Sequence, residues 1–268
     1  MSRNDPDIQR AATAIRKSNF TTAYTGAGIS VESGIPSFRG EGGLWTKYDP
    51  KLLDIDHFLL EPLRSWKTIK EIFYDHFGKA RPNRAHFILA EMEKKGILGR
   101  TITQNIDNLH QEAGSTHVFD FHGNSRRLVC LSCGAIFPVG EVNLDVLPPT
   151  CRLCGGLLKP DYVFFGESIP HIALSAAYEA ASISDVFLVI GTTGEVMPAN
   201  QFPFLAKENG VTIIEINPVE SHYTPAITDI FLKGKATEMM ENLAEALFAP
   251  ALENNQDGVN QDLEIHGE

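Results

Sequence analysis

The sequence predicts an α/β protein in which a parallel sheet is covered by helices on both faces. Short apolar runs that suit buried strands alternate with stretches of helical spacing, which is typical of a parallel sheet. Four of the runs are followed directly by glycine or amide residues, at Gly26, Gln104, Gly191 and Asn217. Because the carboxyl ends of parallel strands line the binding crevice of such sheets, these residues predict one ligand site.

The individual elements follow from the spacing of apolar residues. The continuous apolar run at 185–190 indicates a strand covered on both faces. Strands are predicted at 20–24, 101–103, 118–121, 185–190, 211–216 and 230–232, and helices at 6–18, 85–95, 172–181, 198–209 and 239–247. A helical stripe that includes Trp66, Ile69 and Phe73 predicts further helices inserted over the sheet, with the stripe in the core.

The first strand leads into a glycine-rich loop. Gly26 and Gly28 allow a tight turn close to a ligand, and the N–H groups of residues 27–30 could donate to a pyrophosphate. The loop differs from the dehydrogenase pattern, because Val31 stands where the third glycine belongs. A plain glycine turn is the alternative.

The same loop continues to Phe38 and Arg39. An aromatic ring and a guanidinium in an exposed loop suit covering a bound ligand. The alternative is a structural aromatic residue.

Polar residues follow the strand at 101–103. Gln104, Asn105 and Asp107 provide amides and a carboxylate of the kind that binds a ribose or an amide-bearing ligand. Asp107 could instead cap the helix that follows, although capping explains one residue and not the cluster.

His122 and Gly123 end the predicted strand at 118–121. An exposed histidine titrates near neutral pH and suits acid–base chemistry. Most histidines are structural, and His122 is distinguished by its place between the polar cluster and the cysteines.

The four cysteines form two C-x2-C pairs, Cys130 with Cys133 and Cys151 with Cys154. Seventeen residues separate the pairs, which is the spacing of zinc ribbons. Four thiolates suit a structural Zn²⁺ ion with no open coordination position. A redox pair or disulfides are the alternatives.

Residues 159–167 return the chain from this ribbon. They could bind an extended peptide by strand addition, or form a plain strand.

Composition limits the class of function. The chain has 268 residues, 43% of them hydrophobic, and a net charge of −11, which does not favour direct nucleic-acid binding. Neither a membrane span nor a signal peptide is expected, so a cytoplasmic location is predicted. Residues 251–268 are polar and acidic, and we expect them to be disordered.

Together these motifs resemble the sirtuin family, of the prokaryotic type. They occur in the family's order over roughly residues 10 to 245. The matching stretches are 26–30, 34–39, 103–107, 122–123, the four cysteines, 165–167 and 191–193.

The resemblance implies a Rossmann-like sheet domain, a helical insert and a small zinc-ribbon domain. It divides the catalytic unit, 1–250, into NAD-binding parts at about 5–40, 84–121 and 160–250, a helical insert at about 41–83 and the ribbon at about 122–159.

The activity that the resemblance implies is removal of acyl groups from protein lysines. NAD is the co-substrate, and the reaction releases nicotinamide and O-acyl-ADP-ribose. Acyl-lysine proteins or peptides are the implied partners. The second cofactor is one structural Zn²⁺ ion, held by Cys130, Cys133, Cys151 and Cys154.

The resemblance also assigns roles to residues. His122 would be the general base, and the other catalytic residues, Asn105 and Asp107, would serve the ribose and nicotinamide pocket. Val163, Phe164, Phe165, Gly166 and Glu167 would flank the peptide. The NAD contacts would be Gly26, Ala27, Gly28, Ser30, Phe38, Arg39, Gln104, Asn105, Asp107, Gly191, Thr192, Thr193, Asn217, Lys235 and Ala236.

Departures from the family bear on the acyl group. Thr193 replaces a frequent Ser, and Gly194 resembles the branch that contains desuccinylases, which uses a Tyr-x-x-Arg pair. Here Tyr74 is followed by His76 or Phe77 where Arg is required, and Arg81 or Arg84 are possible substitutes. Without the guanidinium, an acidic acyl group is poorly paired, so the sequence predicts deacetylation or removal of longer apolar acyl groups.

The alternatives are desuccinylation, mono-ADP-ribosyl transfer on the same scaffold, and a non-catalytic binding module or NAD sensor. Retention of His122 argues against ADP-ribosyl transfer as the main activity. The set of Gln104, Asn105, Asp107 and His122 argues against the non-catalytic module, because a pure binder needs no base.

Overall fold

The structure, a computed structural model, describes residues 2–38 and 42–249. Its largest element is a six-stranded sheet of order β3-β2-β1-β7-β8-β9, in which every neighbouring pair is parallel. The strands are β1 (Thr21–Thr25), β2 (Arg100–Thr103), β3 (Val118–Asp120), β7 (Val186–Ile190), β8 (Thr212–Asn217) and β9 (Ile230–Lys233). The predicted parallel α/β class is confirmed. The expected acidic tail, 251–268, lies outside the described residues.

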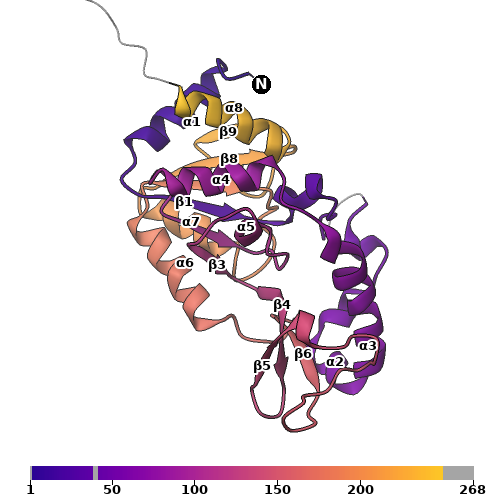
Figure 1. The fold of residues 1–268 in the computed structure, drawn as a ribbon. Helices are drawn as coiled ribbons and strands as arrows, with labels where there is room; N and C mark the ends of the chain where they lie inside the picture. Colours follow the sequence, from indigo (N-terminus) through magenta and orange to yellow (C-terminus); the bar gives the residue numbers. More distant parts are fainter. Residues whose placement is uncertain (1, 39–41, 250–268) are drawn as a thin grey trace, which may run out of the picture.

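Helices cover both faces of the sheet, as Figure 1 shows. One face carries α1 (Pro6–Lys17), α4 (Arg84–Lys94) and α8 (Ala236–Phe248), and the other carries α6 (His171–Ile183) and α7 (Gln201–Glu208). Among the described residues, none of the helices combines the length and apolar character needed to cross a membrane.

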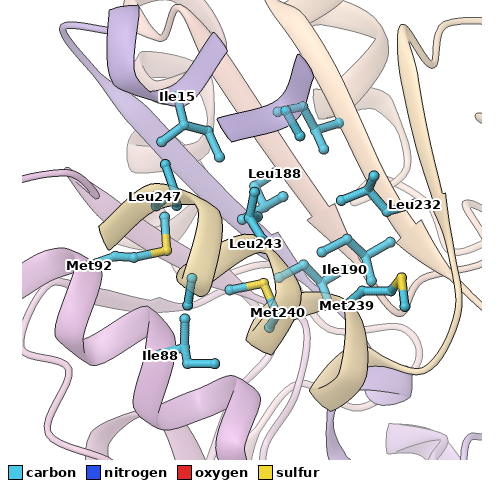
Figure 2. Packing of buried hydrophobic residues seen from close by; sticks show 14 of the residues in the cluster. Ile15, Ile88, Met92, Leu188, Ile190, Leu232, Met239, Met240, Leu243 and Leu247 are labelled. Carbon is cyan, nitrogen blue, oxygen red and sulfur yellow. The ribbon is translucent and has the colours of Figure 1, made fainter. Parts of the chain in front are cut away.

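The sequence of strand β7 is apolar without interruption because helices cover the strand on both faces. Leu188 and Ile190 pack with α1, α4 and α8, where Figure 2 shows them beside Met240 and Leu243. Phe187 and the other alternate side chains pack against α6 and α7. Because successive side chains of a strand point to opposite faces, both faces must be apolar when both are covered.

Two insertions form the smaller part of the molecule. The ribbon consists of β4 (Gly123–Cys130), β5 (Ile136–Pro138) and β6 (Leu158–Tyr162), antiparallel in the order β5-β4-β6. The helical segment contains η2 (Leu44–Thr46), η3 (Pro50–Leu53), α2 (Ile55–Leu60), α3 (Pro62–Ile69), the π-helix η4 (Lys70–His76) and η5 (Phe77–Lys79). Shorter helices elsewhere are η1 (Ala27–Ser33), α5 (Leu109–Glu112) and η6 (Val139–Glu141).

The helical segment packs against the ribbon rather than over the sheet, so that expectation was wrong. Phe58, Trp66 and Phe73 share one core with Leu128 and Tyr162 of the ribbon, and Trp66 Nε1 donates to the Leu158 carbonyl oxygen at 2.9 Å. A ribbon this small cannot bury enough apolar surface by itself. The helices supply the missing surface, and the Trp and Phe stripe is core, as predicted.

Candidate active site

The sheet order reverses between β1 and β7. From β1 the chain proceeds outward to β2 and β3, then returns to β7 on the other side of β1 and proceeds to β8 and β9. The carboxyl ends of β1 and β7 therefore meet at a switch point, where open α/β sheets bind ligands. The loop at Gly26 and the loop at Gly191 both lie there.

These two glycine loops are in direct contact. Gly26 N donates to the Ile190 carbonyl oxygen at 2.9 Å, and Gly28 N donates to that of Gly191 at 2.8 Å. A Cβ atom on Gly28 would lie 2.5 Å from Gly191 Cα, so the loops fit only without side chains here. Since Ile29 N also donates within the loop, to Gly26, the expected row of four free N–H donors is not formed.

The polar cluster connects the end of β2 to the first glycine loop. Asn105 Nδ2 donates to the Gly26 carbonyl oxygen at 3.1 Å and to Ser30 Oγ at 3.2 Å. Ser30 Oγ donates to Asp107 Oδ2 at 2.6 Å, while Asp107 Oδ1 accepts the N–H of Leu109 at 3.0 Å. Burial raises the pKa of Asp107, and the Ser30 hydrogen bond opposes that shift. The N-cap of α5 is Asn108, so Asp107 does not cap that helix; one of its carboxylate oxygens binds the N–H of Leu109, and the other holds the glycine loop.

His122 follows β3 and begins the chain's path into the ribbon. Its Nδ1 lies 2.9 Å from the carbonyl oxygen of Gln104. A carbonyl oxygen can only accept, so Nδ1 carries the proton and Nε2 is the acceptor nitrogen of the neutral ring. Burial lowers the pKa of His122, which the Gln104 hydrogen bond partly offsets. The ring is therefore neutral at pH 7 and able to take a proton at Nε2.

A cavity of about 220 Å³ lies beside this cluster. Among the site residues that the sequence predicted, those that line this cavity are Ala27, Ser30, Phe38, Asn105 and Asp107. The remaining lining is mostly apolar and comes from the loop, the helical segment and the ribbon: Ile35, Pro36, Leu44, Phe73, Tyr74, Phe77, Gly78, Ala80, Ile106, Ser125, Arg126 and Val139.

Most of that apolar lining was missed by sequence reasoning. Phe73 and Phe77 belong to a stripe that also builds the core, so their spacing alone does not reveal a pocket. The available signal was the comparison of Tyr74 and Phe77 with the Tyr-x-x-Arg pair, which has the same spacing. Both residues do line the cavity.

A second group of predicted residues gathers at the ends of β7 and β8, outside the cavity. Asn217 Nδ2 donates to the Thr192 carbonyl oxygen at 3.1 Å and to Glu215 Oε1 at 2.9 Å, and Gln104 Nε2 donates to Thr192 Oγ1 at 3.2 Å. Gly234 N donates to the Asn217 carbonyl oxygen at 3.0 Å, which brings Lys235 and Ala236, at the start of α8, to the same edge.

The predicted peptide segment runs from His122 to the helical segment. Val163 N donates to the His122 carbonyl oxygen at 2.8 Å, and Phe165 forms an isolated parallel bridge with Asp54. Phe164 is buried in the core, whereas 44% of Phe165 is exposed. Of these two residues, Phe165 is therefore the one with surface accessible to a peptide. Arg39 lies outside the described residues.

The four cysteine sulfurs converge at the tip of the ribbon, all within 4.8 Å of one another. The Sγ atoms of Cys130 and Cys154 are 3.5 Å apart, and those of Cys133 and Cys151 are 3.8 Å apart. A tetrahedral Zn²⁺ ion with Zn–S bonds of about 2.3 Å requires sulfurs about 3.8 Å apart. The four thiolates fit one structural zinc ion, and the separations are far too long for disulfides.

The class defined by this geometry is a nucleotide-binding α/β protein with a structural metal ribbon. Comparison with known proteins identifies it further, because residues 26–198 match the Sir2 family model. The chain belongs to the Sir2 family, the sirtuins.

Among curated relatives, NAD-dependent protein deacylase 2 of Pyrobaculum aerophilum is 46% identical over 87% of this chain and 93% of its own length. The NAD-dependent protein deacylase of Thermococcus sibiricus is 45% identical over 88% of this chain and 94% of its own.

Solved structures agree with this assignment. A mutant Sir2 homologue in complex with ADP-ribose has a TM-score of 0.84 at 41% identity, covering 89% of this chain and 95% of that chain. A complex described as Sir2, p53 peptide and NAD⁺ has a TM-score of 0.82 at 33% identity, covering 89% of this chain and 97% of that chain.

Proposed function

We propose that this chain is an NAD-dependent protein-lysine deacylase that releases nicotinamide and O-acyl-ADP-ribose. The observation that carries the proposal is the position of His122. Its side chain is a neutral base bound to the end of β2, and its backbone binds the segment assigned to the peptide. One residue thus connects the nucleotide edge of the sheet to the substrate segment.

The residues around the switch point suit NAD as co-substrate. We propose that Gly191, Thr192, Thr193 and Asn217, with Lys235 and Ala236, hold the adenosine half. Because Asn217 Nδ2 donates to Thr192 and Glu215, its Oδ1 is the atom left to accept from a ribose hydroxyl.

The nicotinamide half is assigned to the cavity. Ala27, Ser30, Phe38, Asn105 and Asp107 line it, and Gly26, Gly28 and Gln104 support the surrounding backbone. NAD supplies a ribose whose bond to nicotinamide breaks. His122 Nε2 would then accept a proton from a ribose hydroxyl, which a base with a pKa near the working pH does efficiently.

For the acyl group, we propose acetyl or longer apolar chains rather than succinyl. Tyr74 and Phe77 both line the cavity, so the phenyl ring of Phe77 occupies the place where a Tyr-x-x-Arg pair requires its guanidinium. His76 is exposed and does not line the cavity. Arg126 also lines the cavity, but it is paired with Glu112.

Mono-ADP-ribosyl transfer is the second candidate, because it would use the same nucleotide site. His122 favours deacylation, since a base held at this place serves the later steps of acyl removal. A pure NAD sensor would need no base.

The test distinguishes these candidates by the mass of the acceptor. The protein is incubated with NAD and an acetyl-lysine peptide, and both peptide and protein are followed by mass spectrometry. Deacylation removes the acetyl mass from the peptide. A gain of ADP-ribose mass on the peptide or on a protein, with the acetyl group retained, would favour the transferase instead.

The partners in this account are acyl-lysine proteins or peptides, with no direct nucleic-acid binding. We also propose a cytoplasmic location. Four thiolates that hold zinc suit a reducing compartment, where cysteines stay reduced.

A further inference from the structure

Lys159, on β6, carries a buried cation close to the peptide segment. Its side chain is 5% exposed. The ammonium donates to the carbonyl oxygens of Pro160 at 2.9 Å and Tyr162 at 2.7 Å, and to Glu167 Oε2 at 2.9 Å. An ammonium has three N–H donors, so each donor has an acceptor. Burial lowers the pKa of Lys159, and the Glu167 carboxylate opposes that shift.

The Glu167 carboxylate links the Lys159 ammonium to the turn that follows β6. Glu167 Oε2 also accepts the N–H of Phe164 at 2.7 Å, and Glu167 N donates to the Phe164 carbonyl oxygen at 3.0 Å. The ammonium lies 4.2 Å from the centre of the Phe164 ring, a cation–π contact. Lys159 therefore holds both ends of the turn from Phe164 to Glu167.

This turn has the geometry of a constrained segment. Gly166 has a φ of +92°, in the left-handed region. Phe165 N donates to the carbonyl oxygen of Leu53 at 2.7 Å, and the carbonyl oxygen of Phe165 accepts from Ile55 N at 3.0 Å. The turn is thus held against the helical segment on one side and by the ammonium on the other. Phe165 is fixed by these backbone bonds and remains exposed.

Lys95 is an exposed lysine with similar partners, and comparison with it shows why the burial of the Lys159 side chain matters. Lys95 pairs with Glu91 at 3.6 Å and lies 4.9 Å from the centre of the Phe248 ring, but 47% of its side chain is exposed. Exposed pairs of this kind contribute little. Loss of a buried partner, by contrast, leaves an uncompensated charge and strongly disfavours the ordered arrangement.

We propose that Lys159 is a positioning residue for substrate, whose ammonium fixes residues 163–167 in the shape that receives an acyl-lysine peptide. This inference rests on the proposed function, because that function assigns the segment to the peptide. Lys159 acts through the segment and touches neither NAD nor the reacting atoms.

The test measures peptide binding directly, without turnover. The variants are Lys159→Met, Glu167→Gln and the double variant, with Lys95→Met as the matched control. A fluorescent acetyl-lysine peptide is titrated in the presence of ADP-ribose, and calorimetry gives the Kd of ADP-ribose separately. Hydrogen exchange reports on residues 163–167. Glu167→Gln keeps the side-chain shape and an acceptor for Phe164 N, so it guards against loss of folding in Lys159→Met.

We expect Lys159→Met to raise the peptide Kd about tenfold or more, with faster exchange confined to the segment. The Kd of ADP-ribose should stay within about twofold, and Lys95→Met should behave as wild type. Glu167→Gln should have a smaller effect. The double variant should bind peptide better than Lys159→Met, because the unpaired carboxylate is gone.

Two results would overturn the inference: a peptide Kd in Lys159→Met equal to that of Lys95→Met, or an equal rise in the Kd of ADP-ribose. Failure of wild type to bind any acyl-lysine peptide would overturn it as well. If wild type binds peptide but does not turn it over, while Lys159→Met still weakens binding, the proposed function fails and the positioning role stands.

Discussion

At the scale of single residues, the chemistry of His122 follows from one hydrogen bond and from its surroundings. The Gln104 carbonyl oxygen fixes the proton on Nδ1, and burial keeps the ring neutral. The same backbone that ends β2 therefore sets the tautomer of the proposed base.

Replacing His122 by alanine should lower kcat at least ~100-fold, because a positioned base contributes on this order. NAD binding should change little, since the proposed contacts to the adenosine half, at Gly191, Thr192 and Asn217, do not involve His122. Steady-state kinetics with an acetyl-lysine peptide measure the first effect, and calorimetry measures the second. Activity above one tenth of wild type in His122→Ala would contradict the assignment.

The pH profile gives an independent check on the same ring. A base works in its neutral form, so activity falls as pH drops through the pKa of His122. Because burial lowers that pKa, the acid limb of kcat/KM should lie below the ordinary histidine value of about 6.5. A limb above that value, or one unchanged in the alanine variant, would assign the titration to another group.

Phe77→Arg should shift acyl preference toward succinyl. A guanidinium at this position would face the cavity beside Tyr74 and pair with a carboxylate in two hydrogen bonds. We expect the ratio of kcat/KM for succinyl over acetyl peptide to rise about tenfold or more. The control is His76→Arg, which places the same charge on an exposed neighbour. An equal shift in both variants would show that general surface charge is responsible.

At the scale of elements, the ribbon and the helical segment form one packed unit. Cys130 and Cys151 are buried in the same cluster as Trp66 and Phe73, and Phe73 also lines the cavity. The metal site is therefore connected through packed side chains to the wall of the proposed acyl and nicotinamide site. The two glycine loops, by contrast, are held at the ends of β1 and β7 of the sheet.

Loss of zinc should consequently abolish peptide turnover while largely preserving the sheet. In Cys133→Ser, we expect less than one zinc ion per chain and a lower Tm, since the metal contributes folding energy. Metal content, turnover and the Kd of ADP-ribose are measured together, with Ser132→Ala as a control that retains all four thiolates. Full turnover by a zinc-free protein would contradict this coupling.

At the scale of the whole molecule, parallel strands were predictable because their apolar runs are bounded by distinctive polar residues. Gly26, Gln104, Gly191 and Asn217 do lie at the carboxyl ends of four adjacent strands. The convergence of the four cysteines was also predictable from spacing alone.

The position of the helical segment was not predictable in the same way. An amphipathic stripe indicates that one face of a helix is buried, but it does not indicate which part of the protein covers that face. Here the partner is the ribbon, which follows much later in the chain. For the same reason the walls supplied by Leu44 and Val139 could not be predicted from the local pattern. The division into domains and the roles of the site residues stay predictions.

The most direct test of the central claim is the stoichiometry of the reaction. Wild-type protein, NAD and an acetyl-lysine peptide are mixed, and mass spectrometry quantifies deacetylated peptide, nicotinamide and O-acetyl-ADP-ribose over time. The account predicts one of each product per turnover, and no deacetylation without NAD. Free acetate in place of O-acetyl-ADP-ribose from the earliest times, or acetyl loss without NAD, would contradict it.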